Sequence, residues 1–556
     1  MIRRATVLAV LLIAAPAHAA APDTCGAPHP TKVITGTFTT DQTGSFVELP
    51  FSVPRGTTAV RAWYCYDQPE INTTLRHTLD FGFYGPRPHG RTLWSMRQYR
   101  GWSGSGFFKD ITVSPRGFAT DPDPSKKPAV NTSRGYRPGP ITPGRWAAEL
   151  GVAAVVGPDQ GDTDGALSWR VELQLETAPR FARHPYRPAR YRTRPAAAGP
   201  AWYAGDMHVH SEQSGDAKQD APAAAIFDYA FGAAALDFVQ VTDHNTDAGW
   251  GEWGRYQAAH PGKLIARNEE ITTYRGHINA PGVRRIADYR TGPVFRRNPD
   301  GSLTQLRAAR PASAIFDAVH RAGGVTTINH PTIFDARIPA FSSICRGCSW
   351  EYDDAETDYA KVDAVEVETG PQGLKIQGSP GPNPFTPLAL EFYEHAMEAG
   401  GHIIAAVSGS DSHAGGTSDP TDITGTPIGS PATMVYARRL SERGIAAAVR
   451  AGHTYVRSFG KASPTVELTS GGQMMGDTVR AAAATFDIRV RGGSGDLLVV
   501  TRNGTPVDTT LLTSDDAAHA YSATAPATGT DRYGILVTRG TAIEAVTTPM
   551  GLTSDA

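Results

Sequence analysis

The stretch Asp206-Met207-His208-Val209-His210 decides the fold of this chain of 556 residues. Successive side chains of a β-strand point to opposite faces, so a strand here places His208 and His210 on one face. Two imidazoles on the same face of a strand are suited to bind zinc, manganese or ferrous iron. The stretch therefore predicts a strand that ends in a metal site.

Further histidines and carboxylates follow along the chain, and most of them come at the end of an apolar run. Imidazole and carboxylate groups together are the ligands of such metal ions, so we expect these pieces to close the same cavity. The pieces are Thr242-Asp243-His244, Glu269-Glu270, Gly276-His277, Asn329-His330-Pro331 and Ser410-Asp411-Ser412-His413.

Residues 201–460 alternate between helical and strand patterns, which predicts an α/β fold with parallel strands. The helical patterns cover 223–235, 311–321 and 387–399. The last two stop at Gly323-Gly324 and Gly400-Gly401, because glycine after the last turn is the expected cap of a helix. Each helical pattern leads into an apolar run that ends next to a predicted ligand. Barrel enzymes place their chemistry at such strand ends.

The segments on either side have a different composition. Residues 21–178 and 461–556 alternate short β-rich runs with Gly and Pro turns, which predicts an antiparallel β-sandwich at each end. Residues 179–200 carry six arginines among Pro, Ala and Tyr, and we expect a linker there, ahead of the metal-binding domain at 201–460. A positively charged rim above the metal site is the alternative role for these arginines.

The first 20 residues have the pattern of a cleavable export signal. Arg3 and Arg4 precede an apolar run, and Ala17-His18-Ala19 has the small-x-small pattern of a cleavage site. The run is too short to span a bilayer and no later segment is long enough, so we expect an exported soluble protein, periplasmic or extracellular. The paired arginines leave open whether export uses the twin-arginine route.

The composition bounds the partners and the disulfides. A formal net charge of -2 gives no overall attraction to nucleic acids or anionic membranes, and the oligomeric state is not specified. In an oxidising compartment the four cysteines are expected to pair as Cys25 with Cys65 and Cys345 with Cys348. The Cys-x-x-Cys spacing of the second pair also occurs in redox motifs and zinc sites, but the chain has no second such motif.

Taken in order, the histidine and carboxylate pieces resemble the polymerase and histidinol phosphatase (PHP) superfamily of metallohydrolases. The export signal, the flanking β domains and the late segments Gly425-Thr426-Pro427 and 452–456 resemble the branch named after the carbaryl hydrolases CehA and McbA. The resemblance covers residues 201–460 and implies a distorted, TIM-like (β/α)7 barrel whose strand ends hold two or three divalent ions of Zn, Mn or Fe.

The resemblance also implies a ligand set for each ion. The first ion is expected on His208, His210, Glu270 and Asp411. The second is expected on Glu270, His277 and His330, which makes Glu270 the bridge. A third would draw on His244, His413 and the residue six positions after His210, which is Asp216, where many members have His. The family pattern of Glu followed by Ile-Thr favours Glu270 over Glu269.

The predicted chemistry follows from the donors. A metal-bound hydroxide is a strong nucleophile because metal binding lowers the pKa of water toward neutrality. His244 or His413, whichever is free of metal, is expected to protonate the leaving oxygen. Asp206 and Asp243 are expected to orient imidazoles by accepting hydrogen bonds, with direct ligation by Asp243 as the alternative. Arg275 is a candidate for binding an oxyanion.

Arg267 and Arg275 flank the Glu269-Glu270 piece. Each of them can equally be an ordinary ion-pair partner.

The predicted function is an exported metal-dependent hydrolase that cleaves a phosphoester, or a carboxylic or carbamate ester, of a small molecule. An amidohydrolase-type enzyme acting on C–N bonds is a rival, but Asp206, Glu270 and the terminal Asp-x-His argue against it. A secreted binding protein with an inactive barrel is the other rival, and the near-complete ligand set argues against that.

Overall fold

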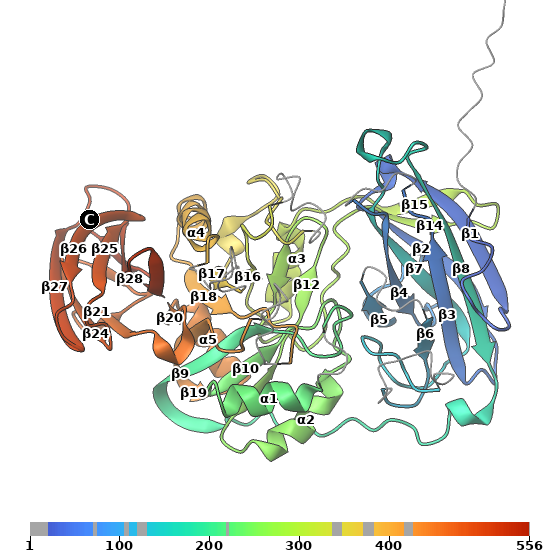
Figure 1. Ribbon diagram of the computed structural model, residues 1–556, viewed down its shortest axis with the longest axis horizontal. Coiled ribbons are helices and arrows are strands. Elements are labelled where there is room, and N and C mark those ends of the chain that lie inside the picture. Colours follow the sequence, from blue (N-terminus) through green and yellow to red (C-terminus); the bar gives the residue numbers. More distant parts are fainter. Residues whose placement is uncertain are drawn as a thin grey trace, which may run out of the picture.

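The computed structural model describes residues 21–69, 75–104, 110–118, 130–217, 222–335, 347–370, 383–415 and 426–554. The expected export signal at 1–20 lies outside these residues. An N-terminal β part, a central α/β part and a C-terminal β part follow one another along the longest axis (Figure 1). The described residues contain five α-helices and 30 strands, so the chain is mixed α/β with many strands and few helices.

Two sheets face each other in the N-terminal part. The first has the order β1 (Lys32–Thr39), β8 (Ala166–Glu176), β3 (Ala59–Tyr66), β6 (Asp110–Val113). The second has the order β15 (Leu303–Arg307), β14 (Val294–Arg297), β2 (Phe46–Val53), β7 (Gly144–Ala154), β4 (Thr78–Tyr84), β5 (Tyr99–Ser103). Alternate residues of facing strands, such as Val47, Leu49 and Leu173, pack between the sheets as one apolar core.

The two outermost strands of the second sheet come from the middle of the chain. β14 pairs in parallel with β2, with Val294 opposite Phe46, and β15 returns antiparallel to β14. The predicted domain at 201–460 therefore contains a hairpin that extends the N-terminal sheet. This hairpin ties the two parts together through backbone hydrogen bonds.

Two sets of parallel strands form the middle of the central part. In one, β10 (Phe238–Val241) lies between β9 (Ala197–Val209) and β11 (Leu264–Arg267). In the other, β17 (Ala364–Thr369) lies between β16 (Thr327–Ile328) and β18 (Ala405–Gly409). β12 (Glu270–Thr272) and β13 (His277–Asn279) extend this second set in antiparallel fashion.

The α-helices alternate with these strands. They are α1 (Ala223–Phe231), α2 (Trp250–Ala259), α3 (Ser313–Arg321), α4 (Thr386–Gly400) and α5 (Glu442–Arg450). The predicted helix-to-strand order is confirmed for α1 to β10, α3 to β16 and α4 to β18. Gly401 caps α4 in the left-handed conformation at φ 68°, which glycine adopts without a steric penalty. A (β/α)7 barrel is not shown, because the described residues have only five α-helices and β12 and β13 are antiparallel.

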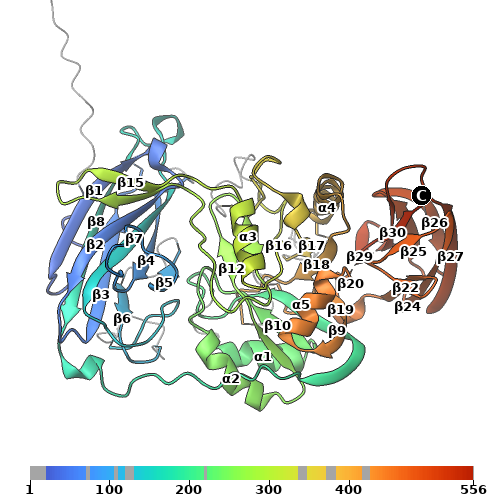
Figure 2. The same ribbon diagram turned by 180° about the vertical axis from the view of Figure 1, so that it is seen from behind.

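The C-terminal part continues a sheet of the central part. From β9 the sheet runs through β19 (Ala432–Leu440), β20 (Thr454–Arg457), β29 (Ala542–Thr547), β28 (Asp531–Arg539), β25 (Leu497–Arg502) and β26 (Thr505–Leu511), with β23 (Thr478–Arg480) and β30 (Met550–Thr553) beside it. A second sheet, β22 (Gln473–Met474), β21 (Thr465–Ser470), β24 (Ala483–Arg491) and β27 (Asp516–Thr524), packs against it through a shared apolar core (Figure 2). One of the two sheets of the C-terminal sandwich is therefore continuous with a sheet of the central part.

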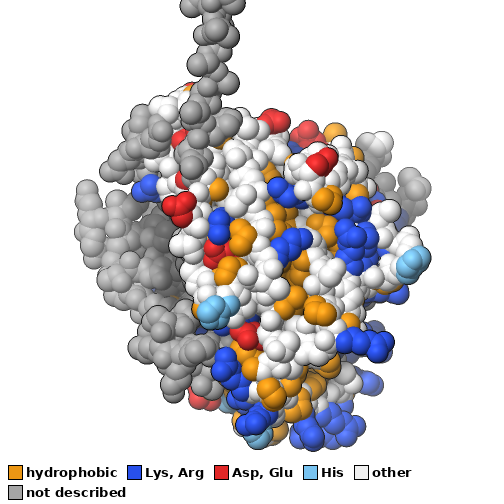
Figure 3. Space-filling view, turned by 90° about the vertical axis from the view of Figure 1, so that its right-hand side faces the viewer, with side chains coloured by type: hydrophobic (Ala, Val, Ile, Leu, Met, Phe, Trp, Pro, Cys, Tyr) orange, Lys and Arg blue, Asp and Glu red, His pale blue; other side chains and the backbone are white. Residues whose placement is uncertain are grey.

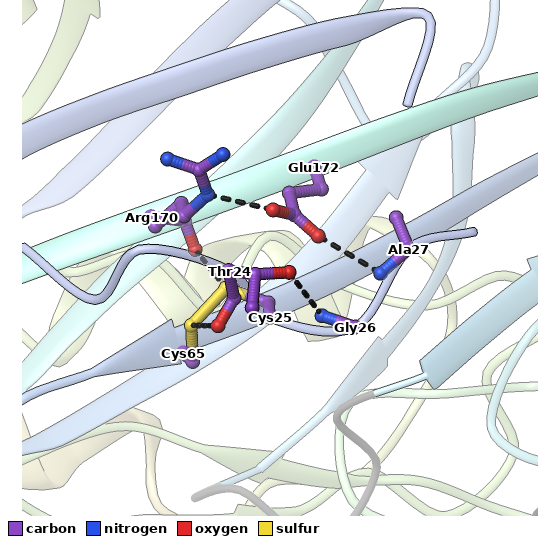
Figure 4. Close-up of a disulfide and its surroundings, with 7 residues drawn as sticks. All are labelled: Thr24, Cys25, Gly26, Ala27, Cys65, Arg170 and Glu172. Carbon is purple, nitrogen blue, oxygen red and sulfur yellow. Dashed lines mark hydrogen bonds and ion pairs between the residues drawn. A yellow bond between two sulfur atoms is a disulfide. The ribbon is translucent and has the colours of Figure 1, made fainter. Parts of the chain in front are cut away.

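One predicted disulfide is confirmed. Cys25 and Cys65 are bonded, with their Cα atoms 5.5 Å apart, beside Glu172, which accepts hydrogen bonds from the Ala27 N–H and from Arg170 (Figure 4). The bond fastens the segment before β1 to the end of β3. The other predicted pair includes Cys345, which lies outside the described residues.

None of the helices in the described residues is long and apolar enough to cross a bilayer.

A buried ion-pair group joins the N-terminal sheet to the central part. Arg290 is completely buried, and its guanidinium lies 2.8 Å from Glu149 of β7 and 2.8 Å from Asp288. It also donates to the Trp94 carbonyl. Burial raises the pKa of the neighbouring Glu48 to about 7, although Arg290 opposes that rise. Asp288 also pairs with Arg307, whereas Glu48 and Glu149 pair with Arg290, so removing Arg290 takes this compensation away from two buried carboxylates.

We therefore expect Arg290→Met to destabilise the protein by about 3–5 kcal/mol, the usual cost of breaking a buried ion pair. Arg285→Met is the matched control, since Arg285 lies on the same connection but is exposed. Urea unfolding followed by tryptophan fluorescence compares the two variants. Equal midpoints for both variants and the parent protein are incompatible with a structural role for Arg290.

Candidate metal centre

The central strands bring six histidines into one buried cluster. His208 and His210 come from the end of β9, His244 follows β10, His277 begins β13, and the others follow β16 and β18. The ring centroids of His210 and His413 lie 3.9 Å apart, those of His210 and His244 4.4 Å, and those of His277 and His330 5.2 Å. The sequence-predicted donors that the cluster brings together are His208, His210, Asp216, His244, Glu270, His277, His330, Asp411 and His413.

Glu270 lies at the centre of this cluster. It is completely buried, and five imidazoles surround its carboxylate. Oε1 is 3.1 Å from His277 Nδ1 and 3.2 Å from His330 Nε2. Oε2 is 3.4 Å from the Nε2 atoms of both His208 and His210, and 2.8 Å from His244 Nδ1.

The environment of Glu270 keeps its carboxyl group ionised. Burial alone would raise the pKa of Glu270, but the imidazoles of His208, His244 and His277 keep it well below its usual range. Its Oε2 atom accepts no hydrogen bond from the described residues in spite of these neighbours. A buried oxygen without a hydrogen bond, facing several nitrogen donors, is the arrangement expected where a cation binds.

Asp411 completes one side of the cluster. Its Oδ1 lies 3.0 Å from His210 Nε2 and 3.3 Å from His208 Nε2. Together with these two imidazoles it forms one of the groups whose ligand atoms all lie within 4.8 Å of one another. Asp411 and His330 both have positive φ, at 52° and 28°, which side chains rarely adopt. Backbone strain of this kind collects at functional sites, where the surrounding structure enforces it.

Asp216 lies between His244 and His413, as the predicted third site requires. Its Oδ2 is 3.1 Å from His244 Nε2 and 3.4 Å from His413 Nε2. Burial would lower the pKa of His413, but Asp216 raises it to about 9. The side chains of Asp216 and Asp411 are 35% and 25% exposed, whereas those of His208, His210 and Glu270 are fully buried. The cluster therefore opens to solvent on the side of these two aspartates.

Other side chains orient the imidazoles from behind. Glu366 of β17 lies 2.9 Å from His208 Nδ1, and the Ser214 hydroxyl lies 2.9 Å from His210 Nδ1. The Cys348 carbonyl lies 2.7 Å from His330 Nδ1. A hydrogen bond to one ring nitrogen keeps the other directed at the cluster and raises the basicity of that second nitrogen as a metal ligand. Sequence reasoning missed Glu366, although an acid inside the apolar run of β17 is a signal that could have revealed it.

The two aspartates next to the motif histidines have different partners. Asp243 accepts hydrogen bonds from Ser211 and Ser214, so it supports His210 through Ser214 and does not enter the cluster. Asp206 was expected to orient an imidazole. Its carboxylate instead accepts the backbone N–H groups of His208, Ser410 and Gly429, at 3.1, 3.0 and 2.8 Å. It therefore fixes the backbone between β9 and β18.

The two arginines close to Glu270 in the sequence, Arg267 and Arg275, have ion-pair partners outside the histidine cluster. Arg275, the predicted oxyanion-binding residue, lies 2.6 Å from Glu356 and over the ring of Tyr352. Arg267 lies 2.9 Å from Glu442. Among the described residues neither guanidinium contacts a member of the cluster. For Arg275 the structure therefore has the ion pair that was the alternative to an oxyanion-binding role.

The N-terminal part contributes to the wall of the site. The Trp102 ring of β5 meets the His244 ring edge-on, at a centroid distance of 6.4 Å. The Tyr99 hydroxyl donates to the Asn245 carbonyl, and Arg137 forms a bidentate ion pair with Asp247. These contacts fix the loop that carries His244.

Comparisons with known proteins add little to this geometry. No family model matches the chain, and no curated protein matches it. One similar solved structure is a two-domain protein containing a predicted PHP-like metal-dependent phosphoesterase from Bacteroides vulgatus, with 17% identity over 66% of this chain and 98% of that one, at a TM-score of 0.34. A CARDB domain from Pyrococcus furiosus has 18% identity over 16% of this chain and 94% of that one, at a TM-score of 0.14.

An engineered protein has 15% identity over 57% of this chain and 49% of that one, also at a TM-score of 0.14. With TM-scores this low, none of these likenesses carries an argument about function.

If Glu366 orients His208 for metal binding, Glu366→Ala should weaken metal binding by about 10- to 100-fold, the usual cost of losing such a support. Glu356→Ala is the control, because Glu356 pairs with Arg275 outside the cluster. Competition with a chromogenic chelator measures the affinity of each protein for zinc. Unchanged affinity in Glu366→Ala, with the protein folded, means that His208 needs no such support.

Proposed function

We propose that this chain is a metal-dependent hydrolase of PHP type that cleaves an ester bond in a small molecule. The observation that carries the proposal is the buried Glu270 carboxylate with five imidazoles around it. Imidazole and carboxylate donors in one buried group suit zinc, manganese or iron. Without a cation, so many buried titratable groups would have to be compensated by protonation alone.

The ligand set proposed for each ion follows the groups that the structure brings together. His208, His210, Asp411 and Glu270 would hold the first ion, and Glu270, His277 and His330 the second. His244, His413 and Asp216 would hold a third. When bound, the ions would polarise the ester and lower the pKa of a water molecule.

The residues on the open side of the cluster have the remaining tasks. His413 and His244 lie beside the exposed Asp216, where a leaving oxygen would face solvent. Either imidazole, when it is not a ligand, is positioned to give that oxygen a proton. Arg267 and Arg275 are paired elsewhere, so charge on the substrate would be balanced by the bound cations and not by arginine.

We infer further that the two central sheets form one distorted barrel. Isolated bridges between Val209 and Ser412 and between His244 and Glu270 join the sheets at two places. Both bridges involve cluster residues or their direct neighbours. The contacts that close the barrel would therefore also bring the cluster residues together. Residues 1–20 and the disulfide between Cys25 and Cys65 support the proposal that the protein is exported.

The two rivals predict different outcomes for the same cluster. An amidohydrolase-type site ends in an aspartate alone, whereas here both Asp411 and His413 reach the cluster. A binding protein with an inactive barrel needs no such set of donors. A panel of substrates distinguishes whether the protein cleaves a phosphoester, a carboxylic ester or a carbamate ester.

The neighbouring acids Glu270 and Glu269 provide a matched pair of variants. Both are buried, but Glu269 accepts from the Ala287 N–H and lies outside the cluster. We expect Glu270→Gln to lower bound metal and turnover by at least about 100-fold, the upper end of the cost of losing a supporting residue. Glu269→Gln should keep both.

The assay uses p-nitrophenyl phosphate, a phosphodiester, an acetate and a carbamate, with metal content measured on the same preparations. Full turnover in Glu270→Gln contradicts the bridging role of Glu270. Full metal content in the parent protein, with no turnover on any of the four esters, favours the binding-protein alternative.

A further inference from the structure

A cavity distinct from the metal centre lies at an open edge of the N-terminal sandwich. It has a volume of about 460 Å³, between β1 of the first sheet and β2 of the second. Its lining comprises residues 32–35, residues 49–52, Arg145 and residues 297–299, and none of these belongs to the metal cluster. Volumes of this size are typical of sites for small molecules.

The charged groups of this cavity all have the same sign. Lys32, Arg145 and Arg297 line it, and no carboxylate does among the described residues. The Lys32 ammonium donates to the Pro50 carbonyl at 3.1 Å, and the Arg297 guanidinium donates to the Thr35 carbonyl at 3.0 Å. Each bond crosses from one sheet to the other and places a cation in the gap. Because an ammonium has three donors and a guanidinium five, both groups keep donors for a ligand.

Arg145 is the most available of the three cations. Its side chain is exposed on β7, opposite Ser52 of β2. Its guanidinium makes no hydrogen bond or ion pair with the residues that the structure describes. Arg297 comes from the β14–β15 hairpin, so the cavity exists only because that hairpin has joined the N-terminal sheet.

The cations destabilise one another in the absence of a counter-charge. Burial lowers the pKa of Lys32, and the positive charges of Arg145 and Arg297 lower it further. The same effect reaches Arg87, whose pKa is lowered by burial and then by Arg296 and Arg145. Figure 3 shows this end of the molecule, where Lys and Arg side chains gather beside a band of hydrophobic side chains. An anion bound here would relieve this repulsion.

The cavity also has an apolar surface. Val33, which is 40% exposed, and the half-buried Pro50 supply this surface, whereas Leu49 and Phe51 of the lining lie buried behind it. A simple inorganic ion would leave this surface in contact with water. A ligand with both charged and apolar parts fits the lining better.

We propose that this cavity binds a small molecule that carries two or more anionic groups, of the phosphate or carboxylate type, next to an apolar part. Arg145 and Arg297 bind the anionic groups through paired N–H donors, as guanidinium groups do with planar or tetrahedral oxyanions. Lys32 adds a point charge from the opposite sheet. The site is independent of the proposed hydrolysis, because it shares no residue with the metal cluster.

Calorimetric titration of the full chain, after removal of metal by dialysis against a chelator, tests this site. The probes are phenyl diphosphate and benzene-1,3,5-tricarboxylate, with neutral benzyl alcohol as the uncharged control. We expect one molecule of at least one anionic probe to bind per chain, and we expect its affinity to fall as NaCl is added. The stronger of the two probes identifies the type of anionic group.

Two variants locate the binding. Arg145→Glu should weaken it by about tenfold or more, as expected for loss of a hydrogen bond to a charged group, and Lys32→Glu combined with Arg297→Glu should abolish it. Arg480→Glu, at an exposed position of β23 in the C-terminal part, is the control for net charge and should bind like the parent.

Circular dichroism and thermal unfolding establish that each variant is folded. Absence of binding by both anions, binding of benzyl alcohol as strong as that of the anions, or an equal loss in Arg480→Glu would each overturn the proposal.

Discussion

One buried carboxylate, Glu270, determines how the central part of this protein is arranged. Five imidazoles lie against it, and they come from the ends of β9 and β10, from β13 and from the segment after β16. A carboxylate removed from water is costly unless opposite charge or hydrogen bonds compensate it. The strands that deliver these imidazoles therefore have to meet at one place.

The flanking parts fix that meeting point from two sides. On the N-terminal side, Trp102 contacts His244, Arg137 binds Asp247, and the buried Arg290 joins Glu149 of the sandwich to Asp288. On the C-terminal side, β9, which carries His208, pairs with β19 in the sheet that continues into the second sandwich. Movement of either part would displace a histidine. Both β parts therefore contribute contacts that hold the candidate metal centre together.

Local sequence pattern predicted the features that depend on neighbouring residues. The alternation around His208 and His210 gave a strand with both imidazoles on one side, and the glycine pairs marked the ends of α3 and α4. The pairing of Cys25 with Cys65 followed from the small number of cysteines.

Features that depend on distant pairing were not visible in this way. Glu366 reaches His208 across 158 positions, and Arg275 finds Glu356 across 81, so neither partner follows from spacing. The hairpin of β14 and β15 has an ordinary strand pattern, which does not say which sheet it will join. For the same reason, the continuity of the sheet from the central part into the C-terminal part had no signal in the sequence.

The bridging position of Glu270 is tested most directly by anomalous X-ray diffraction from crystals grown with zinc or manganese. We expect a peak for the first ion and one for the second, each at about 2.0–2.3 Å from an oxygen of Glu270, with imidazole nitrogens at similar distances. Ions ordered only outside the histidine cluster, or ions on the histidines with Glu270 turned away from them, would contradict the central role given to this carboxylate.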